Sequence, residues 1–424
     1  MVESFFRKLS LVVTDETLRA RLLFVAGALV VSRALAAIPV PGINAQELAA
    51  FLSNNQFFGL LNIFSGGGFS NLSIVMLGVS PYITASIVMQ LMTVLIPRLK
   101  EIYQEEGDSG RMRFMQYSRY LTIPLAFIQG FGFTLLLQQN GIIADLSVLE
   151  FATNVMVIAA GSMLLMWIGE LMSEFGVGNG VSLLIFAGIV ASLPSQAAQF
   201  FFAFDISMLP AYLGFLAAGA AIIAGVVFIT EAERPIPVTY ARRVRGSKVL
   251  GGVSTYLPLR VNQAGVMPII FALSILLFPQ MIATFLAKSS IAVVATVASA
   301  IQGFLADQLI YGVSYFFLVF VFTYFYTAIT FEPTQIAKNL QKSGAFIPGV
   351  RPGPQTAEYL GNVITRITLV GALFLSVLAV LPIILQSVTG ITAVTIGGTA
   401  LLIVVSVVLD IVKKLDAQTS IREY

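Results

Sequence analysis

Apolar residues recur along the chain in long runs, separated by short polar or basic stretches. A helix needs about 20 apolar residues to cross a bilayer, and ten runs reach or approach that length. The pattern indicates an all-α polytopic membrane protein with ten transmembrane helices. We place the predicted spans at residues 21–40, 74–96, 115–138, 152–171, 181–200, 209–229, 264–286, 309–330, 364–385 and 392–411.

One apolar stretch between the first two spans is too short to cross a membrane. Residues 57–73, FFGLLNIFSGGGFSNLS, begin like a membrane segment, but the apolar run stops after about eight residues at Asn62. Ser65 and three glycines follow. The segment is also too apolar for an ordinary exterior loop, and a re-entrant loop with only a packing role is one interpretation of it.

The composition narrows the chemistry that the chain can perform. It is 57% hydrophobic and 11% charged, with no cysteine and no histidine. Thiol nucleophiles, imidazole bases, His or Cys metal sites and disulfides are therefore excluded. No phosphate-binding loop is present, so we expect no cofactor, no metal and no nucleotide of the chain's own.

The basic residues predict how the chain is threaded through the membrane. The N-terminus has four, the second–third connection five and the sixth–seventh connection six, and Lys338, Lys342 and Arg351 lie in the eighth–ninth connection. The positive-inside rule places these segments and both termini in the cytoplasm. The first apolar run imitates a cleavable signal peptide, but Arg33 interrupts it, so we expect a retained first helix.

Two short motifs recur at equivalent places in the two sets of five spans. GVSPYI at Gly78–Ile83 matches GVMPII at Gly265–Ile270, and SLLI at Ser182–Ile185 matches ALLI at Ala400–Ile403. Corresponding spans would have opposite orientations, which predicts an inverted repeat of residues 1–205 and 206–424. Coincidence in a chain rich in Leu and Ile is the alternative.

The few ionisable residues near the spans do not form a mid-membrane site. Glu170, Glu174, Asp307 and Asp410 cluster at span ends, where we expect solvated helix termini. We expect Arg33 to reach the outer interface or to pair with a neighbour, and a buried functional charge is the alternative. Asn179, which lies among glycines between two spans, is expected to serve a tight turn.

Branched aliphatic residues are then the candidate functional groups. Val79 and Ile83 are four apart on one helical face, as are Ile185 and Ile189, and the repeat adds Ile270 and Ile403. Six such side chains meeting at mid-membrane would form a hydrophobic constriction. For each residue alone, ordinary helix packing is the alternative.

Several longer motifs resemble the SecY family, the central subunits of protein-conducting channels, along essentially the whole chain. They are IFSGGG at Ile63–Gly68, GVSPYITASIVMQL at Gly78–Leu91, GNGVSLLIFAGIV at Gly178–Val190, ERPIPVTYARR at Glu233–Arg243, LPLRVNQAGVMP at Leu257–Pro268, FIPGVRPG at Phe346–Gly353 and GGTALLIVVSVVLD at Gly397–Asp410.

The resemblance implies a clamshell of two inverted five-helix halves around a central pore, with a lateral gate to lipid. The family's pore ring falls on the six aliphatic residues above, and Gln90 and Asn262 match polar positions of the gate. The short segment at 57–72 would be a plug, with Leu60, Asn62, Ile63, Phe64, Ser65, Gly66, Gly67 and Gly68.

The resemblance also implies partners and a location. Arg242 and Arg243 in the loop 230–262, and Arg351 in the loop 331–362, resemble positions that engage the ribosome or the SecA ATPase. SecE and SecG subunits, unfolded preproteins, signal sequences and membrane lipid are the other expected partners. The expected location is the bacterial plasma (inner) membrane.

Two other functions remain as alternatives. An inverted-repeat secondary transporter of a small solute would need a polar site at mid-membrane, where this chain offers aliphatic residues. An intramembrane enzyme would need paired aspartates or a Ser/His pair, and no such residues are present in the spans. We therefore expect a passive channel for unfolded polypeptides that releases transmembrane segments sideways into lipid.

Overall fold

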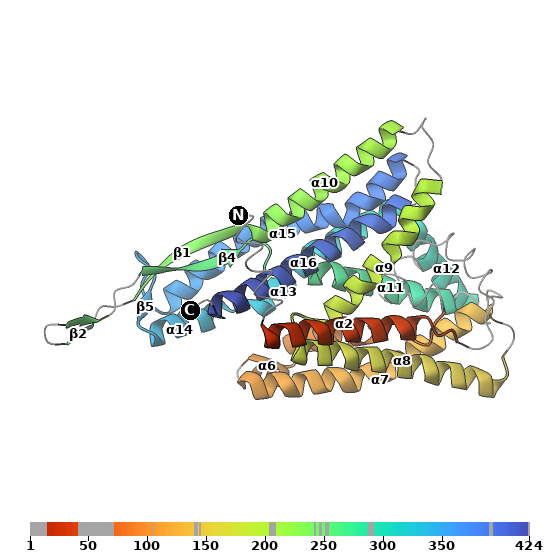
Figure 1. Cartoon of the computed structure of the whole chain (residues 1–424), viewed down its shortest axis with the longest axis horizontal. Coiled ribbons are helices and arrows are strands. Elements are labelled where there is room, and N and C mark those ends of the chain that lie inside the picture. Colours follow the sequence, from red (N-terminus) through yellow and green to blue (C-terminus); the bar gives the residue numbers. More distant parts are fainter. Residues whose placement is uncertain are drawn as a thin grey trace. The chain divides into compact units, whose positions relative to one another are not determined.

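The computed structural model describes residues 15–40, 72–104, 106–139, 143, 146–202, 209–240, 243–245, 248–250, 254–286, 292–389 and 393–422 (Figure 1). The chain divides into two compact units. The first comprises Met1–Leu209, Leu277–Gln302 and Val407–Tyr424, and the second comprises Pro210–Leu276 and Gly303–Ser406. Each unit is described by itself.

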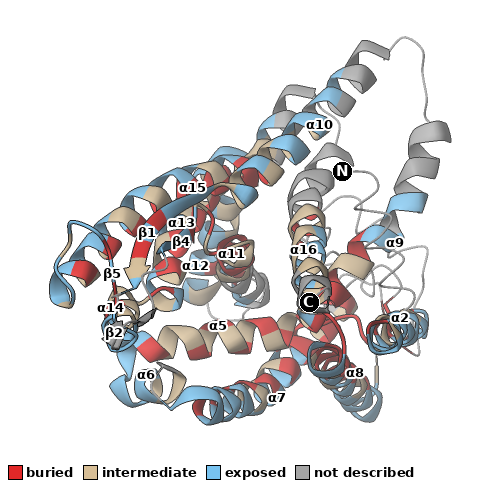
Figure 2. Cartoon of the chain, turned by 60° about the vertical axis from the view of Figure 1, so that its left-hand side comes forward, coloured by how far each residue is buried: buried red, intermediate tan, exposed pale blue. Residues whose placement is uncertain are grey.

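Long helices build the first unit, and consecutive ones pack against each other, α5 on α7, α7 on α8 and α8 on α9. The first helix, α2, packs on α8 and α9. Buried residues lie where these helices meet (Figure 2). The helices are α2 (Glu16–Ala36), α5 (Ser80–Leu95), α6 (Pro97–Gln104), α7 (Gly107–Gln139), α8 (Val148–Phe175) and α9 (Gly180–Phe202).

Local sequence signals fix where several of these helices begin and end. Asp15 caps α2 by accepting the amides of Thr17 and Leu18. Ser147 and Glu150 form a reciprocal capping box at the start of α8. Pro97 separates α5 from α6, because the residue before a proline disfavours helical geometry, and the two helices meet at a bend of 115°.

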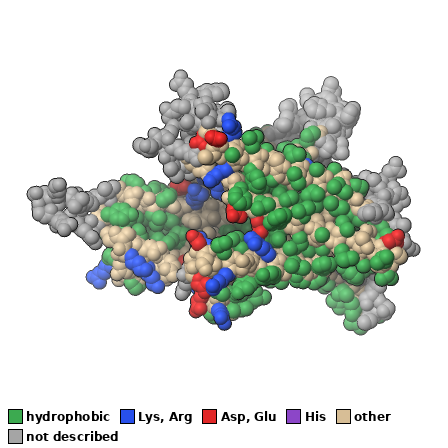
Figure 3. All heavy atoms as spheres, turned by 60° about the horizontal axis from the view of Figure 1, so that its bottom comes forward, with side chains coloured by type: hydrophobic (Ala, Val, Ile, Leu, Met, Phe, Trp, Pro, Cys, Tyr) green, Lys and Arg blue, Asp and Glu red, His purple; other side chains and the backbone are tan. Residues whose placement is uncertain are grey.

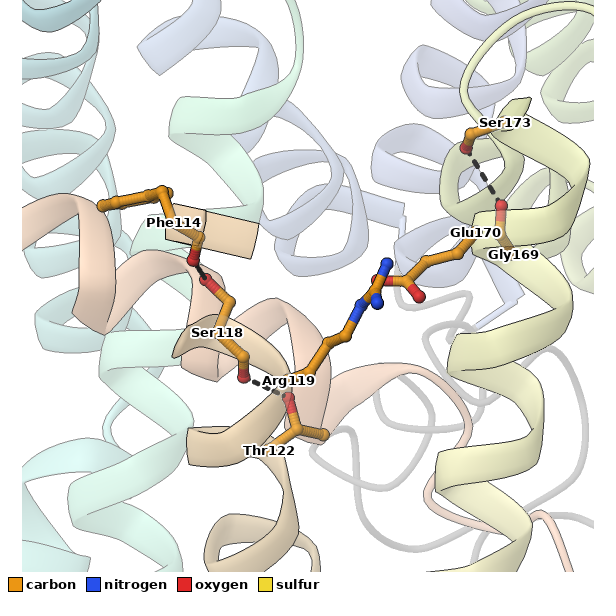
Figure 4. A network of polar contacts seen from close by, with 7 residues as sticks. All are labelled: Phe114, Ser118, Arg119, Thr122, Gly169, Glu170 and Ser173. Carbon is orange, nitrogen blue, oxygen red and sulfur yellow. Dashed lines mark hydrogen bonds and ion pairs between the residues drawn. The ribbon is translucent and has the colours of Figure 1, made fainter. Parts of the chain in front are cut away.

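An ion pair joins α7 to α8 (Figure 4). Arg119 Nε lies 2.7 Å from Glu170 Oε1, and the Glu170 side chain is only 15% exposed. Around it, the hydroxyls of Ser118, Thr122 and Ser173 donate to carbonyls four residues earlier in their own helices. Glu170 was expected to be a solvated helix terminus; that interpretation is wrong, because a neighbouring helix supplies a cation.

The other carboxylates at span ends serve their own helices. Asp307 caps α13 by accepting the amides of Leu309 and Ile310. Asp410 pairs with Lys414 one turn further along an exposed face of α16. Both are ordinary surface roles and agree with the expectation from sequence.

Antiparallel packing of α13 on α15 forms the centre of the second unit. The apolar helix α12 (Ala292–Ala306) lies in a connection for which the sequence predicted no helix. The remaining helices are α10 (Leu209–Glu231), α11 (Met267–Leu286), α13 (Gln308–Thr330), α14 (Pro333–Lys342), α15 (Pro354–Thr389) and α16 (Ala393–Arg422). Helices α11, α12 and α16 contribute residues to both units.

The described residues also include five strands, so the prediction of an all-α chain is corrected. Strands β4 (Ser254–Arg260), β1 (Glu233–Tyr240) and β5 (Ala345–Phe346) form one antiparallel sheet, and β2 (Arg243–Arg245) pairs with β3 (Lys248–Leu250). The prolines in β1 disfavour a strand, so the sequence did not predict this element. They are tolerated because β5 pairs only with the end of β1, which leaves the edge beside the prolines open.

A small hydrophobic cluster lies under this sheet. Alternate residues of β1, Ile236 and Val238, are buried together with Leu259 of β4, Ile347 after β5 and Leu360 of α15. The sixth–seventh and eighth–ninth connections, far apart in sequence, therefore share one folded base.

A helix of the structure overlaps each of the ten predicted spans, although the boundaries differ. Helix α5 begins at Ser80 rather than at residue 74, and α16 continues to Arg422. Within the described residues, four helices are long and apolar enough to cross a membrane, or five if α5 and α6 count as one bent span.

Exposed apolar side chains form stripes on the outer surfaces of these helices, and hydrophobic side chains cover a wide area of one face (Figure 3). On α13, Leu309, Val313, Phe317 and Val321 follow one another at four-residue intervals and are 41–74% exposed. Exposure of such an apolar stripe to water would be unfavourable, whereas contact with lipid is favourable. The chain is a multi-pass membrane protein.

The buried position of Glu170 leads to a prediction about stability. Glu170→Gln removes the carboxylate from Arg119, and we expect the free energy of unfolding to fall by roughly 1–2 kcal/mol. Lys414→Met, which breaks an exposed pair on one helix, is the control and should cost only about 0.3–0.5 kcal/mol. The midpoint of thermal unfolding in detergent measures both. Equal shifts would show that the α7–α8 pair contributes no more than a surface pair.

Candidate functional site

The two halves of the predicted repeat have the same local geometry. Gly78 and Gly265 both have positive φ angles, +59° and +61°. In each case the helix begins two residues later, at Ser80 and at Met267, and a proline occupies the second helical position. The resemblance between GVSPYI and GVMPII is therefore a shared turn-and-helix start.

The residue types explain this shared start. Glycine adopts a positive φ without steric cost, and no neighbouring atom would obstruct a side chain at Gly265, so its backbone angle is the constraint. Proline suits the first turn of a helix because the amide it lacks would have no partner there.

The predicted ring residues Ile83 and Ile270 occupy equivalent places in this geometry. The Ile83 amide donates to Val79 O at 3.0 Å, and the Ile270 amide donates to Val266 O at 3.3 Å. Each isoleucine therefore lies in the first turn of its helix, five residues after the glycine. Val79 precedes α5 and lies one turn before Ile83.

A tight connection between α8 and α9 positions the next two ring residues. Gly178 has a φ of +95°, and Asn179 accepts the amides of Val181 and Ser182 at the start of α9. A side chain at Gly180 would clash with the Gly169 carbonyl, so only glycine permits this approach. The turn role expected for Asn179 agrees with this geometry.

All six predicted ring residues are buried, with exposures of 2–7%. Val79, Ile83, Ile185 and Ile189 belong to the first unit, and Ile270 and Ile403 to the second. Within the first unit, Val79 lines a small cavity together with Leu184, which adjoins Ile185. Their burial is compatible with a constriction and also with ordinary packing.

Arg33 adopts an arrangement that the sequence did not reveal. Its guanidinium Nη2 donates to the carbonyls of Ala187 at 2.9 Å and Gly188 at 3.1 Å, on α9. The same cavity that Val79 lines contains Arg33. The expected reach to the outer interface is wrong, whereas the alternative, pairing with a neighbour, is confirmed, with backbone carbonyls as the acceptors.

The two predicted gate residues carry buried oxygens that lack a hydrogen-bond partner in the described part of the chain. These atoms are Gln90 Oε1 and Asn262 Oδ1. The Gln90 amide nitrogen makes one long contact, 3.4 Å, to Ser86 Oγ on its own helix. The interhelical hydrogen bond that would explain both amides is not observed. A buried acceptor without a partner costs about 1–3 kcal/mol.

The three arginines of the predicted partner contact have different surroundings in the structure. Arg351 is exposed in a turn between Gly349 and Gly353, whose φ angles are +81° and +105°. The Thr356 hydroxyl donates to the Arg351 carbonyl at 2.8 Å and fixes its backbone. Arg243 lies in β2, and Arg242 lies outside the described residues.

The predicted plug, residues 57–72, lies outside the described residues except for Leu72, which is fully buried. Its assignment stays a prediction. In the described part of the chain, no three acidic side chains come together as a metal site would require.

Comparison with known proteins identifies the relatives of the chain. The SecY family model matches residues 73–412. The protein translocase subunit SecY of Mycobacterium bovis is 42% identical over 428 residues, which cover 96% of both chains.

Two solved structures share the fold at 18% sequence identity, and each comparison covers 96% of this chain and 94% of the other. One is a protein-conducting channel, with a TM-score of 0.65. The other is Sec61 in the canine ribosome-channel complex from the endoplasmic reticulum, with a TM-score of 0.63. With the family model and the 42% identical relative, these similarities establish that the chain belongs to the SecY family.

Proposed function

We propose that the chain is the pore-forming subunit of a bacterial protein-conducting channel. It passes unfolded secretory polypeptides across the membrane and releases hydrophobic segments sideways into lipid. The observation that carries this proposal is the 42% identity with a protein translocase subunit over nearly the full length of both chains. A small-solute transporter is disfavoured, because the spans offer aliphatic residues where such a protein needs a polar site.

The proposed architecture is a clamshell of ten helices in two inverted halves, residues 1–205 and 206–424. The shared turn and helix start at Gly78 and Gly265 supports an internal repeat. The ring would comprise the six buried aliphatic residues, and wetting of such a constriction is unfavourable, so it excludes ions until a chain enters.

Gln90 and Asn262 are proposed to act at the lateral gate. Their buried oxygens without partners support this role, because rearrangement of the surrounding helices would let them pair. Such positions keep the closed arrangement from becoming too stable. The segment with Leu60, Asn62, Ile63, Phe64, Ser65, Gly66, Gly67 and Gly68 is proposed as a plug beneath the ring.

Energy is proposed to come from partners, since we expect no enzymatic activity of the chain itself. The ribosome or SecA would contact Arg242, Arg243 and Arg351 in the cytoplasmic loops, and SecE and SecG would complete the complex. The exposed Arg351 turn and the sheet that joins both loops support a docking base. Charge asymmetry supports a plasma-membrane location with both termini in the cytoplasm.

The ring assignment predicts equal effects at equivalent positions. Ile83→Asn and Ile270→Asn each place an amide in the seal and should favour wetting. If opening becomes easier by about 1–2 kcal/mol, the open fraction rises 5- to 30-fold. Export of a substrate with a defective signal sequence measures this, with Ile83→Val and Ile270→Val as controls. Export as stringent as in the parent would remove both residues from the constriction.

The docking assignment predicts a specific loss at Arg351. Arg351→Glu reverses a charge on an exposed turn whose backbone is fixed, so membrane insertion should be normal while SecA-driven translocation falls strongly. Lys342→Glu, an equal charge reversal on the neighbouring exposed helix α14, is the control and should translocate nearly as well as the parent. Translocation in inverted vesicles is the measurement. Equal rates for the two variants would leave Arg351 with a topological role only.

The plug assignment predicts a leak without loss of transport. Deleting residues 60–68 removes one of two stacked seals, so the resting channel should open briefly and conduct ions while polypeptides still pass. Single-channel conductance of the purified complex in planar bilayers measures this. A well-folded deletion variant with parental conductance at rest is incompatible with a plug at this segment.

A further inference from the structure

A charged side chain lies among the apolar residues of the first unit. Arg33 is in the last turn of α2, where the helix dipole favours a cation. A charge within a membrane-spanning bundle is costly and is therefore retained mainly where it has a function. Its guanidinium donates to the middle of α9, to two consecutive carbonyls that are 2.9 and 3.1 Å away.

These two carbonyls lie in the segment that carries two ring residues. Ala187 and Gly188 fall between Ile185 and Ile189 in sequence. On a helix of 3.6 residues per turn, successive residues are about 100° apart, so Ala187 faces away from both isoleucines and Gly188 lies between Ala187 and Ile185. Arg33 thus bonds to the backbone of α9 outside the face on which Ile185 and Ile189 are centred.

The other ring residues of this unit border the same place. The cavity around Arg33 is lined by Ser32 of α2, by Gly78 and Val79 of the turn before α5, and by Ala187 and Gly188 of α9. Arg33 therefore lines one cavity together with both segments from which the first unit's four ring residues project.

We propose that Arg33 is a positioning residue for the seal. Its guanidinium fixes the rotation and depth of α9, and its aliphatic stem packs beside the turn that carries Val79. A planar fork with several donors can engage two carbonyls at once, whereas an ammonium is a point donor. The proposal rests on the proposed function, because it assigns Arg33 to the ring of that channel.

The test uses the purified channel complex in liposomes and measures resting ion flux. Arg33→Met keeps the length and volume but removes the donors, and should raise the flux severalfold with translocation retained. Arg33→Lys keeps the charge and should give an intermediate flux. Arg366→Met, at an exposed arginine of α15, is the matched control and should match the parent.

A second readout follows the ring itself. The chain has no cysteine, so Ile189→Cys gives a single thiol. Its reaction with a membrane-impermeant maleimide should be slow in the parent background and faster with Arg33→Met. A loss of stability alone, without movement of α9, would leave this rate unchanged.

The outcomes separate this inference from the proposed function. If Ile185→Asn leaks while Arg33→Met has parental flux and parental labelling at residue 189, Arg33 does not position the seal. If neither variant leaks, the ring assignment itself is wrong. If Arg33→Met does not accumulate in the membrane, Arg33→Lys is tested in its place. Parental ion flux and parental labelling at residue 189 in Arg33→Lys would then overturn the proposal.

Discussion

A polar group that a helix carries into an apolar bundle is costly unless it finds a partner there, because no water is available to replace one. The first unit meets this constraint in three ways. Hydroxyls such as that of Ser118 bond to their own helix. Glu170 forms an ion pair with Arg119 of the neighbouring helix α7. The Arg33 guanidinium donates hydrogen bonds to two backbone carbonyls of α9. The Glu170 and Arg33 contacts also hold one helix against another, so in these two cases satisfying a polar group also positions the helices.

The same constraint shapes the two helices that start inside the protein. The first amides of any helix lack intrahelical partners. At α5 and α11 a proline removes one of these amides, and a glycine with positive φ redirects the chain just before the helix. Aliphatic side chains at Ile83 and Ile270 can then lie in the first turn, where a polar side chain would add a further group to satisfy.

The connections outside the apolar bundle are stabilised in a different way. The sixth–seventh and eighth–ninth connections form a sheet over their own hydrophobic cluster, and β1 of one connection pairs with β5 of the other. A folded base holds an exposed arginine such as Arg351 more rigidly than a free loop would. The proposed aliphatic ring and the proposed docking base therefore differ in their physical basis.

Sequence alone determined the apolar helices and the matching turns at Gly78 and Gly265, because hydrophobic runs and glycine–proline spacing are local. It also led to the SecY family. Only the tertiary structure decided the acceptors of Arg33, which are 154 and 155 residues away, the partner of Glu170, 51 residues away, and the β1–β5 pairing. Such contacts depend on which helices become neighbours, and that is settled by packing of the whole chain rather than by any local pattern.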